Sequence, residues 1–378
     1  MNPQPLVDYA PALRLALLAG VVALLPLSWV WLRQRGADTR GRLAALTALT
    51  LFLTFDLVVF GAFTRLTDSG LGCPDWPGCY GAASPLGAHE AITAAQAELP
   101  SGPVTWSKAW IEMIHRYLAM TVGALILALA AVSWRERRRL PFLLAWPLLT
   151  LAWVLVQGLF GKYTVTLKLY PAVVTLHLLG GLTLLGLLAA QHEGYRQRPL
   201  TLPAGLRRGV VAALLVLGVQ LALGGWVSSN YAVLACGGFP QCNGSWWPQA
   251  DFAGGFTLLR ELGGVAAHGR PLTLDGLVAI HLAHRLFAVV LALVLAVLAW
   301  RLRQASGSAA RPYGSAIALL LLAQLATGLS NVVLGWPLVA ALAHTAGAAG
   351  LVLTLTLLLA RSASRRPAAA PIGQPAAA

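Results

Sequence analysis

Nine apolar runs of about 20 residues recur along this chain of 378 residues, and no other feature restricts its fold as strongly. A helix of that length crosses a hydrocarbon core about 30 Å thick. The alternating pattern of a membrane β-barrel is absent, which leaves helices to satisfy the buried backbone. The composition agrees, with 58% hydrophobic and 11% charged residues. We therefore predict an all-α polytopic membrane protein with spans at about 12–32, 43–64, 108–133, 141–160, 170–191, 209–228, 276–300, 315–333 and 338–360.

The basic residues indicate how these spans are oriented. The net charge is +14, and eighteen of the 27 lysines and arginines fall in five short patches between or after apolar runs. Such patches mark the cytoplasmic side of a membrane protein, so we interpret them as a topology signal and not as a nucleic-acid site. The spans then run from an outside N-terminus to a cytoplasmic C-terminus. The cysteine-containing loops fall on the periplasmic side of a bacterial inner membrane.

Two copies of one cysteine pattern divide the chain. The stretches "GLGCPDWPGCYG" and "VLACGGFPQCNG" each contain a C-x5-C pair, and 163 residues separate Cys73 from Cys236 and Cys79 from Cys242. Four such landmarks recur in the same order, which indicates a tandem duplication of a four-span unit. We predict two pseudo-symmetric four-helix bundles as a parallel repeat. The expected parts are an extra N-terminal helix and basic loop (1–42), an N-terminal half (43–191), a basic cytoplasmic linker (192–208), a C-terminal half (209–360) and a disordered tail (361–378).

One histidine lies roughly six to eight residues inside each of four predicted spans, about 9–12 Å deep. These are His115, His177, His284 and His344, two in each half. Two opposed imidazoles in an apolar four-helix unit are typical of six-coordinate haem iron. The alternative is a buried histidine bonded to a backbone carbonyl. A bare metal ion fits less well, because no carboxylate or cysteine completes a tetrahedral set at this depth. Covalent haem is excluded, because no C-x-x-C-H motif occurs.

The two halves differ at one position beside these histidines. Glu112 and His281 each lie three residues before the histidine of their helix, on the same face and nearer the outside. A carboxylate beside a porphyrin can accept a proton or stabilise developing positive charge, so we predict that Glu112 is catalytic. Its alternative role is to hold a partner such as Arg116 or Lys108. His281 is either a spare ligand or a propionate partner, and Arg116 and Arg285 bind either propionates or loop carbonyls.

The cysteines fall in loops assigned to the oxidising outside. Five intervening residues with Gly and Pro turns allow a disulfide within each pair, and we predict both. Zinc would need ligands gathered from two separate loops. A redox role for the first pair is a further alternative.

These motifs give the chain a family resemblance. The combination of "RLTDSGLGCPDWPGC", "EMIHR" and paired histidines resembles the heme A synthase family over about residues 43 to 360. The resemblance implies a bundle of eight core helices, with substrate haem in the N-terminal half and haem b in the C-terminal half. It implies that His115 and His177 flank haem O or haem A, with Glu112 as catalytic carboxylate. It also implies that His284 and His344 ligate the iron of haem b.

The resemblance further implies a reaction and partners. The C8 methyl group of haem O is oxidised to a formyl group, through a hydroxymethyl intermediate, to give haem A for cytochrome oxidase. Electrons pass through haem b to a membrane acceptor such as a quinone, and haem O comes from heme O synthase, a candidate physical partner. A homo-oligomer is compatible with this function. The extra N-terminal helix and the complete second cysteine pair depart from the family pattern.

Three other functions make different predictions. An electron-carrying membrane cytochrome b is the chief alternative, and it predicts two symmetric, permanently bound haems with no need for Glu112. A transporter predicts broken helices and a polar site at the membrane midplane. An assembly factor that does not turn over would need neither haem site complete.

Overall fold

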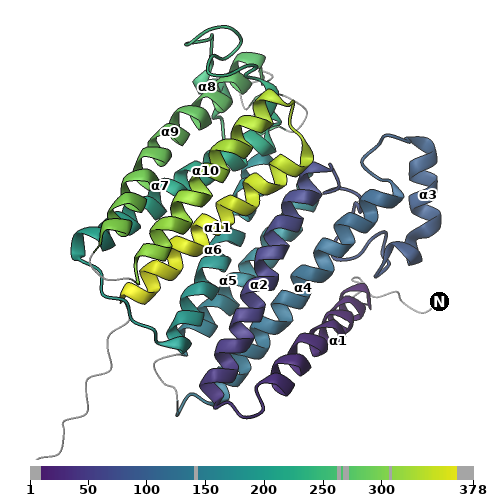
Figure 1. The fold of residues 1–378 in the computed structure, drawn as a ribbon. Helices are drawn as coiled ribbons and strands as arrows, with labels where there is room; N and C mark the ends of the chain where they lie inside the picture. The colour runs from purple at the N-terminus through teal and green to yellow at the C-terminus, as the bar shows by residue number, and fades with distance from the viewer. Residues whose placement is uncertain (1–9, 140–143, 262–264, 267–271, 306–308, 364–378) are drawn as a thin grey trace, which may run out of the picture.

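A computed structural model describes residues 10–139, 144–261, 265–266, 272–305 and 309–363. Among these residues, nine helices are long and apolar enough to cross a membrane, which confirms the predicted class (Figure 1). They are α1 (Ala10–Arg33), α2 (Thr39–Leu66), α4 (Trp106–Arg135), α5 (Ala145–Thr166), α6 (Pro171–Arg196), α7 (Ala204–Ser229), α9 (Leu274–Gln304), α10 (Arg311–Val333) and α11 (Leu338–Ala363). The tail predicted to be disordered lies outside the described residues from 364 onward.

Shorter elements occupy the connections between these helices. After α2 come η1 (Pro85–Ala88) and α3 (His89–Glu98), and after α7 come η3 (Ala232–Leu234) and α8 (Phe252–Gly255). Two strands of two residues each, β1 (Arg260–Glu261) and β2 (Val265–Ala266), pair antiparallel in the second of these connections. The connections of the two halves thus have similar lengths but different local structures.

The helices α4 and α9, which carry Glu112 and His281, begin in the same way. Thr105 caps α4 by accepting a hydrogen bond from the backbone N–H of Lys108, at 3.3 Å. Thr273 caps α9 by accepting one from the backbone N–H of Gly276, at 3.2 Å. Such caps satisfy N–H groups that the first turn leaves unpaired. The caps therefore fix where each helix begins, and with it the height of the histidine that the helix carries.

The helices of each half contact one another in the same order. In the N-terminal half α4 contacts α2 and α5, and α6 contacts the same two helices. In the C-terminal half α9 contacts α7 and α10, and α11 contacts those two. The helix α1 packs mainly on α4 and also touches α2, and the halves meet where α6 and α2 contact α7 and α11 (Figure 1). The histidine-bearing helices α4 and α6, and likewise α9 and α11, therefore lie across from each other.

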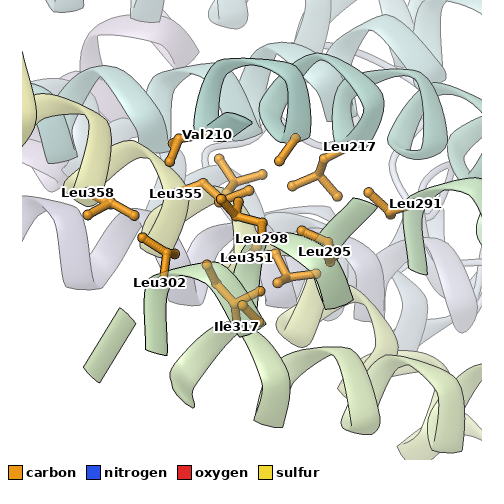
Figure 2. Packing of buried hydrophobic residues seen from close by; sticks show 14 of the residues in the cluster. Val210, Leu217, Leu291, Leu295, Leu298, Leu302, Ile317, Leu351, Leu355 and Leu358 are labelled. Atoms are coloured by element: carbon orange, nitrogen blue, oxygen red, sulfur yellow. The ribbon is translucent and has the colours of Figure 1, made fainter. Parts of the chain in front are cut away.

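Leucines fill the interior of the C-terminal half. Leu217 of α7, Leu295 and Leu298 of α9, and Leu351 and Leu355 of α11 are buried in one cluster (Figure 2). In a membrane, lipid tails are as apolar as leucine, so close van der Waals packing holds such helices together. The outward faces carry exposed leucines, as a surface in contact with lipid requires.

A polar cluster joins the halves where α2 and α7 end. Arg65 donates a hydrogen bond to the Ser228 carbonyl oxygen at 2.6 Å, and its guanidinium lies 4.0 Å from the centroid of the Tyr231 ring. Tyr231 donates its hydroxyl proton to Asp68 at 2.7 Å, and Asp68 also forms an ion pair with Arg65 at 3.2 Å. Ser228 and Tyr231 lie 163 residues after Arg65 and Asp68, respectively. Repeat-equivalent residues therefore meet at this seam.

Candidate functional site

The two predicted ligands of the N-terminal half, His115 and His177, are half-buried, and each ring faces a glycine. A Cβ atom added at Gly61 of α2 would lie 3.0 Å from Cε1 of His115, and one at Gly161 of α5 would lie 3.6 Å from Cε1 of His177. The two imidazoles are near enough to interact electrostatically. A larger residue at Gly61 would press on the ring of His115, so the glycine gives this imidazole the room that it needs.

The C-terminal half repeats this arrangement. A Cβ atom added at Gly224 of α7 would lie 3.2 Å from Cε1 of His284, and one at Gly328 of α10 would lie 3.2 Å from Cε1 of His344. These two imidazoles are likewise near enough for a charge on one to affect the other. Each half therefore brings two imidazoles together from facing helices, each in a space that a glycine of the intervening helix leaves open.

This donor set fits haem better than a bare metal ion. Haem iron takes two axial ligands from the protein, and two histidines supply them. Within the described residues, no group of three or more His, Cys, Asp or Glu side chains gathers to hold an ion. In the N-terminal half, Nδ1 of His115 and Nδ1 of His177 are buried without a hydrogen-bond partner in the described part of the chain. Buried polar atoms without a partner are costly, and in a membrane protein they are found chiefly at functional sites.

Glu112 joins α4 to the first cysteine loop. The residue is 3% exposed, and its Oε2 accepts a hydrogen bond from the backbone N–H of Cys73 at 2.8 Å. Its Oε1 accepts a hydrogen bond from Arg116 at 2.5 Å. Lys108, the other partner considered, instead donates to the Gly102 carbonyl oxygen at 3.1 Å. The pairing with Arg116, the structural alternative, is therefore present, and the catalytic role stays a prediction.

Arg116 holds the backbone of the same loop. Its Nη1 donates to the backbone carbonyl oxygens of Asp75 at 2.9 Å, Pro77 at 3.2 Å and Gly78. Its Nη2 lies 3.4 Å from the carbonyl oxygen of Cys73. Of the two roles considered for this arginine, the structure shows the binding of loop carbonyls. One guanidinium thus draws the turn between the two cysteines onto α4.

Arg285 binds the second cysteine loop in the equivalent way. It donates to the Cys236 carbonyl oxygen at 2.6 Å and to that of Gln241 at 3.3 Å. These acceptors lie 163 residues after Cys73 and Gly78. Where Arg116 contacts Glu112, Arg285 donates to Nε2 of His281 at 3.1 Å. A carboxylate in one half is therefore replaced by an imidazole in the other, while the contact with the arginine and the bonds from the arginine to the loop are retained.

Both predicted disulfides are present. Cys73 is joined to Cys79 and Cys236 to Cys242, and all four residues are buried. Gly72 lets the first loop approach α4, because a Cβ atom there would collide with the backbone of Lys108. The disulfides therefore close two compact loops directly above the histidine-bearing helices.

Among the described residues, the extra helix α1 covers the first cysteine loop and not the second. Leu15 of α1 is fully buried in a cluster with Cys73, Cys79 and Met113. A Cβ atom at Gly78 would lie 3.6 Å from Cβ of Pro11. The second loop instead packs with Val278 of α9. The helix outside the repeat is therefore attached to the half that carries Glu112.

Gly161 and Gly328, and the glutamines one turn before them, Gln157 and Gln324, were not predicted from the sequence. Gln324 donates to the His344 carbonyl oxygen at 2.9 Å, and Gln157 occupies the space that Gly180 leaves open. The shared signal is Q-x-x-x-G on the helix beside a histidine. It was detectable as a repeat, but its meaning depended on knowing which helices are neighbours.

Comparisons with known proteins show the family of this chain. The family described as cytochrome oxidase assembly protein (COX15-CtaA) matches residues 44–356. A heme A synthase of Shewanella oneidensis is 39% identical over 328 residues, which cover 84% of this chain and 96% of that protein. A heme A synthase of Caulobacter vibrioides is 30% identical, over 83% of this chain and 94% of that protein. One of Halalkalibacterium halodurans is 27% identical, over 75% of this chain and 85% of that protein. The chain therefore belongs to the cytochrome oxidase assembly protein family, as its cysteine and histidine motifs predicted.

Proposed function

We propose that this protein is a heme A synthase, which takes haem O as substrate and releases haem A. The observation that carries the proposal is the paired cradle, in which each half sets two half-buried histidines against two glycines. Relatives that bear this name match most of the chain, including the segments that form both cradles. The two halves differ at Glu112 and His281, as a protein with one reacting haem and one resident haem requires.

The N-terminal half is proposed to hold the substrate between His115 and His177 while its C8 methyl group is oxidised to a formyl group. The C-terminal half is proposed to hold haem b through His284 and His344. A haem b at that position would supply one-electron transfer to an acceptor in the membrane, such as a quinone. The repeated helix contacts support the proposed division into residues 43–191 and 209–360.

Glu112 is proposed to act on the substrate from one helical turn above His115. Arg116 and the Cys73 N–H hold its two oxygens, so the carboxylate has one orientation. In that orientation Oε2, the oxygen bonded to the Cys73 N–H, would accept the proton that leaves the reacting carbon substituent. The first disulfide loop then contributes to the site by orienting this carboxylate.

The membrane orientation and the partners are part of the same proposal. Both disulfide loops lie at the ends of α2 and α7 opposite to the arginines that begin α2, which supports periplasmic cysteine loops and a cytoplasmic C-terminus. Heme O synthase would deliver the substrate, and a second copy of this chain is a further candidate partner.

Reverse-phase chromatography of haem extracted from the purified protein tests the proposal, with expression in cells that also make haem O. We expect haem B together with haem A or hydroxylated haem O. A variant with His115→Ala and His177→Ala serves as the control and should retain haem B alone. Haem B alone from the unaltered protein, at two per chain, would overturn the proposal in favour of an electron-carrying cytochrome b.

A further inference from the structure

The two histidine pairs differ in what holds the ring nitrogen that faces away from a bound iron. An axial histidine binds iron through one ring nitrogen, and the other is free to form a hydrogen bond. In the C-terminal half, Nδ1 of His344 and Nδ1 of His284 each contact a polar side chain of a neighbouring helix. In the N-terminal half, Nδ1 of His115 and Nδ1 of His177 have no such partner among the described residues.

Thr327 provides the better-defined contact. Its Oγ1 lies 3.0 Å from Nδ1 of His344, and its hydroxyl donates to the Ala323 carbonyl oxygen at 2.7 Å. Because the hydroxyl proton is directed at the Ala323 carbonyl oxygen, Oγ1 is left to accept a hydrogen bond from Nδ1–H of His344. That bond fixes the tautomer that leaves Nε2 free to bind iron, and it makes the imidazole a stronger electron donor.

Gln220 holds the other histidine of this half. Its Nε2 donates to the His284 carbonyl oxygen at 3.2 Å. The same atom lies 3.1 Å from Nδ1 and 3.4 Å from Nε2 of the His284 ring, so Nδ1 is the nearer ring nitrogen. A half-turn of the amide places Oε1 against the ring instead, where it accepts from Nδ1–H. In either orientation, the amide fixes the position of the ring relative to α7.

The equivalent positions of the N-terminal half are apolar. Phe160 directly precedes Gly161, as Thr327 precedes Gly328. Leu57 lies four residues before Gly61, as Gln220 lies four residues before Gly224. The ring of Phe60 stacks on that of His115, with centroids 6.3 Å apart and 9° between the planes. Replacement of hydroxyl and amide by apolar groups accounts for the missing partners of both Nδ1 atoms.

We propose that Thr327 and Gln220 are positioning residues that make the C-terminal pair a permanent haem site, and that Phe160 and Leu57 leave the N-terminal pair weakly held so that its haem exchanges. The inference rests on the proposed function, because a synthase must take in haem O and release haem A while it keeps haem b. Loss of such a supporting bond typically lowers metal affinity 10–100-fold. A difference in affinity of this size is enough for one haem to stay bound while the other exchanges.

The test follows haem leaving the full-length holoprotein in the presence of excess apomyoglobin, which captures released haem. Chromatography of the haem that remains reports both halves at once, since haem B belongs to one and haem O or haem A to the other. We expect the unaltered protein to lose haem O or haem A at least tenfold faster than haem B. Thr327→Val and Gln220→Leu should each accelerate the loss of haem B about tenfold and leave the other haem unaffected.

Three further variants make the test specific. Thr327→Ser keeps the hydroxyl and should retain haem B as the unaltered protein does. Thr354→Val is the matched control, because within the described part of the chain this hydroxyl of α11 bonds to the Gly350 carbonyl oxygen of its own helix, at 2.7 Å, and to no other group. Leu57→Gln should slow the loss of haem O or haem A. In a redox titration, Thr327→Val should raise the midpoint potential of haem b, since a weaker donor favours ferrous iron, whereas Thr354→Val should not.

The outcomes are separable from those for the proposed function. Equal rates of loss of the two haems from the unaltered protein would overturn the inference, and so would haem B retention that neither Thr327→Val nor Gln220→Leu changes. The proposed function survives either result, provided that haem A is present in the extract. Absence of haem A with unequal retention would instead remove the proposed function and leave the difference in hydrogen bonding intact.

Discussion

The two halves of the molecule share a scaffold and differ in what surrounds it. In both, an arginine on the histidine-bearing helix holds a disulfide loop through the same two backbone positions, and each histidine faces a glycine. The N-terminal half has Glu112 where the C-terminal half has His281. Its histidines have apolar neighbours at Nδ1, whereas those of the C-terminal half have polar ones. Among the described residues, α1 covers the disulfide loop of the N-terminal half and not the other. The histidines, glycines and arginine contacts are thus shared, whereas the residues proposed to set how tightly a haem is held and how it reacts differ.

Removal of the histidines tests the comparison with the largest expected effect. His115→Ala with His177→Ala should abolish haem A formation and leave about one haem B per chain. His284→Ala with His344→Ala should abolish bound haem B. In each case two axial ligands are lost. Extracted haem is quantified by chromatography, and retention of full haem content by either double variant would show that the halves are not independent sites.

Glu112 and His281 provide the second test. Glu112→Gln keeps the shape of the side chain and can still bond to Arg116, but it cannot accept a proton as a carboxylate does. We expect haem A yield to fall at least 100-fold, the scale of a lost general base, with haem B content unchanged. His281→Gln, the change at the equivalent position, should leave haem A yield within about threefold of normal.

A structural role for Glu112 has a different signature. If the carboxylate only anchors the loop, Glu112→Gln and Arg116→Gln should lower the melting temperature together, and the haem A yield of both should follow the amount of folded protein. Normal haem A yield from folded Glu112→Gln would remove its catalytic assignment.

The disulfides test whether the loops differ as their surroundings suggest. Cys73→Ser with Cys79→Ser and Cys236→Ser with Cys242→Ser should each cost about 2 kcal/mol of stability, because both loops close over the same short separation. Only the first pair should also lower haem A yield, since the Cys73 N–H bonds to Glu112. Thermal unfolding in detergent measures the first quantity and haem extraction the second. Equal haem A yields from both double variants would separate the first loop from the reaction.

The sequence predicted the spans, the four histidines and both disulfides because each leaves a periodic or repeated signal. The sequence left open whether Arg116 and Arg285 bind loop carbonyls or propionates, since that choice depends on how near each loop folds to its helix. Gly328 and Thr327 escaped notice because their roles come from the contact of α10 with α11. Such a contact is set by the packing of many side chains and has no signature within one helix.

The smallest effect is expected at the seam, where Tyr231 bonds to Asp68. Tyr231→Phe removes one hydroxyl while keeping the ring beneath Arg65, and the ring is 54% exposed, so the loss should be about 0.5 kcal/mol at pH 7. Burial, with help from the hydrogen bond to Asp68, raises the pKa of Tyr231 above its ordinary value of 10.0. A raised pKa stabilises the folded state fully below pH 10 and loses that contribution as the pH rises through the folded value.

The melting temperatures of the two proteins should therefore differ by a small amount at pH 7 and converge as the pH rises above 10. A difference that persists above pH 11 would show that the hydroxyl contributes nothing through Asp68, and that the halves are joined here by Arg65 alone.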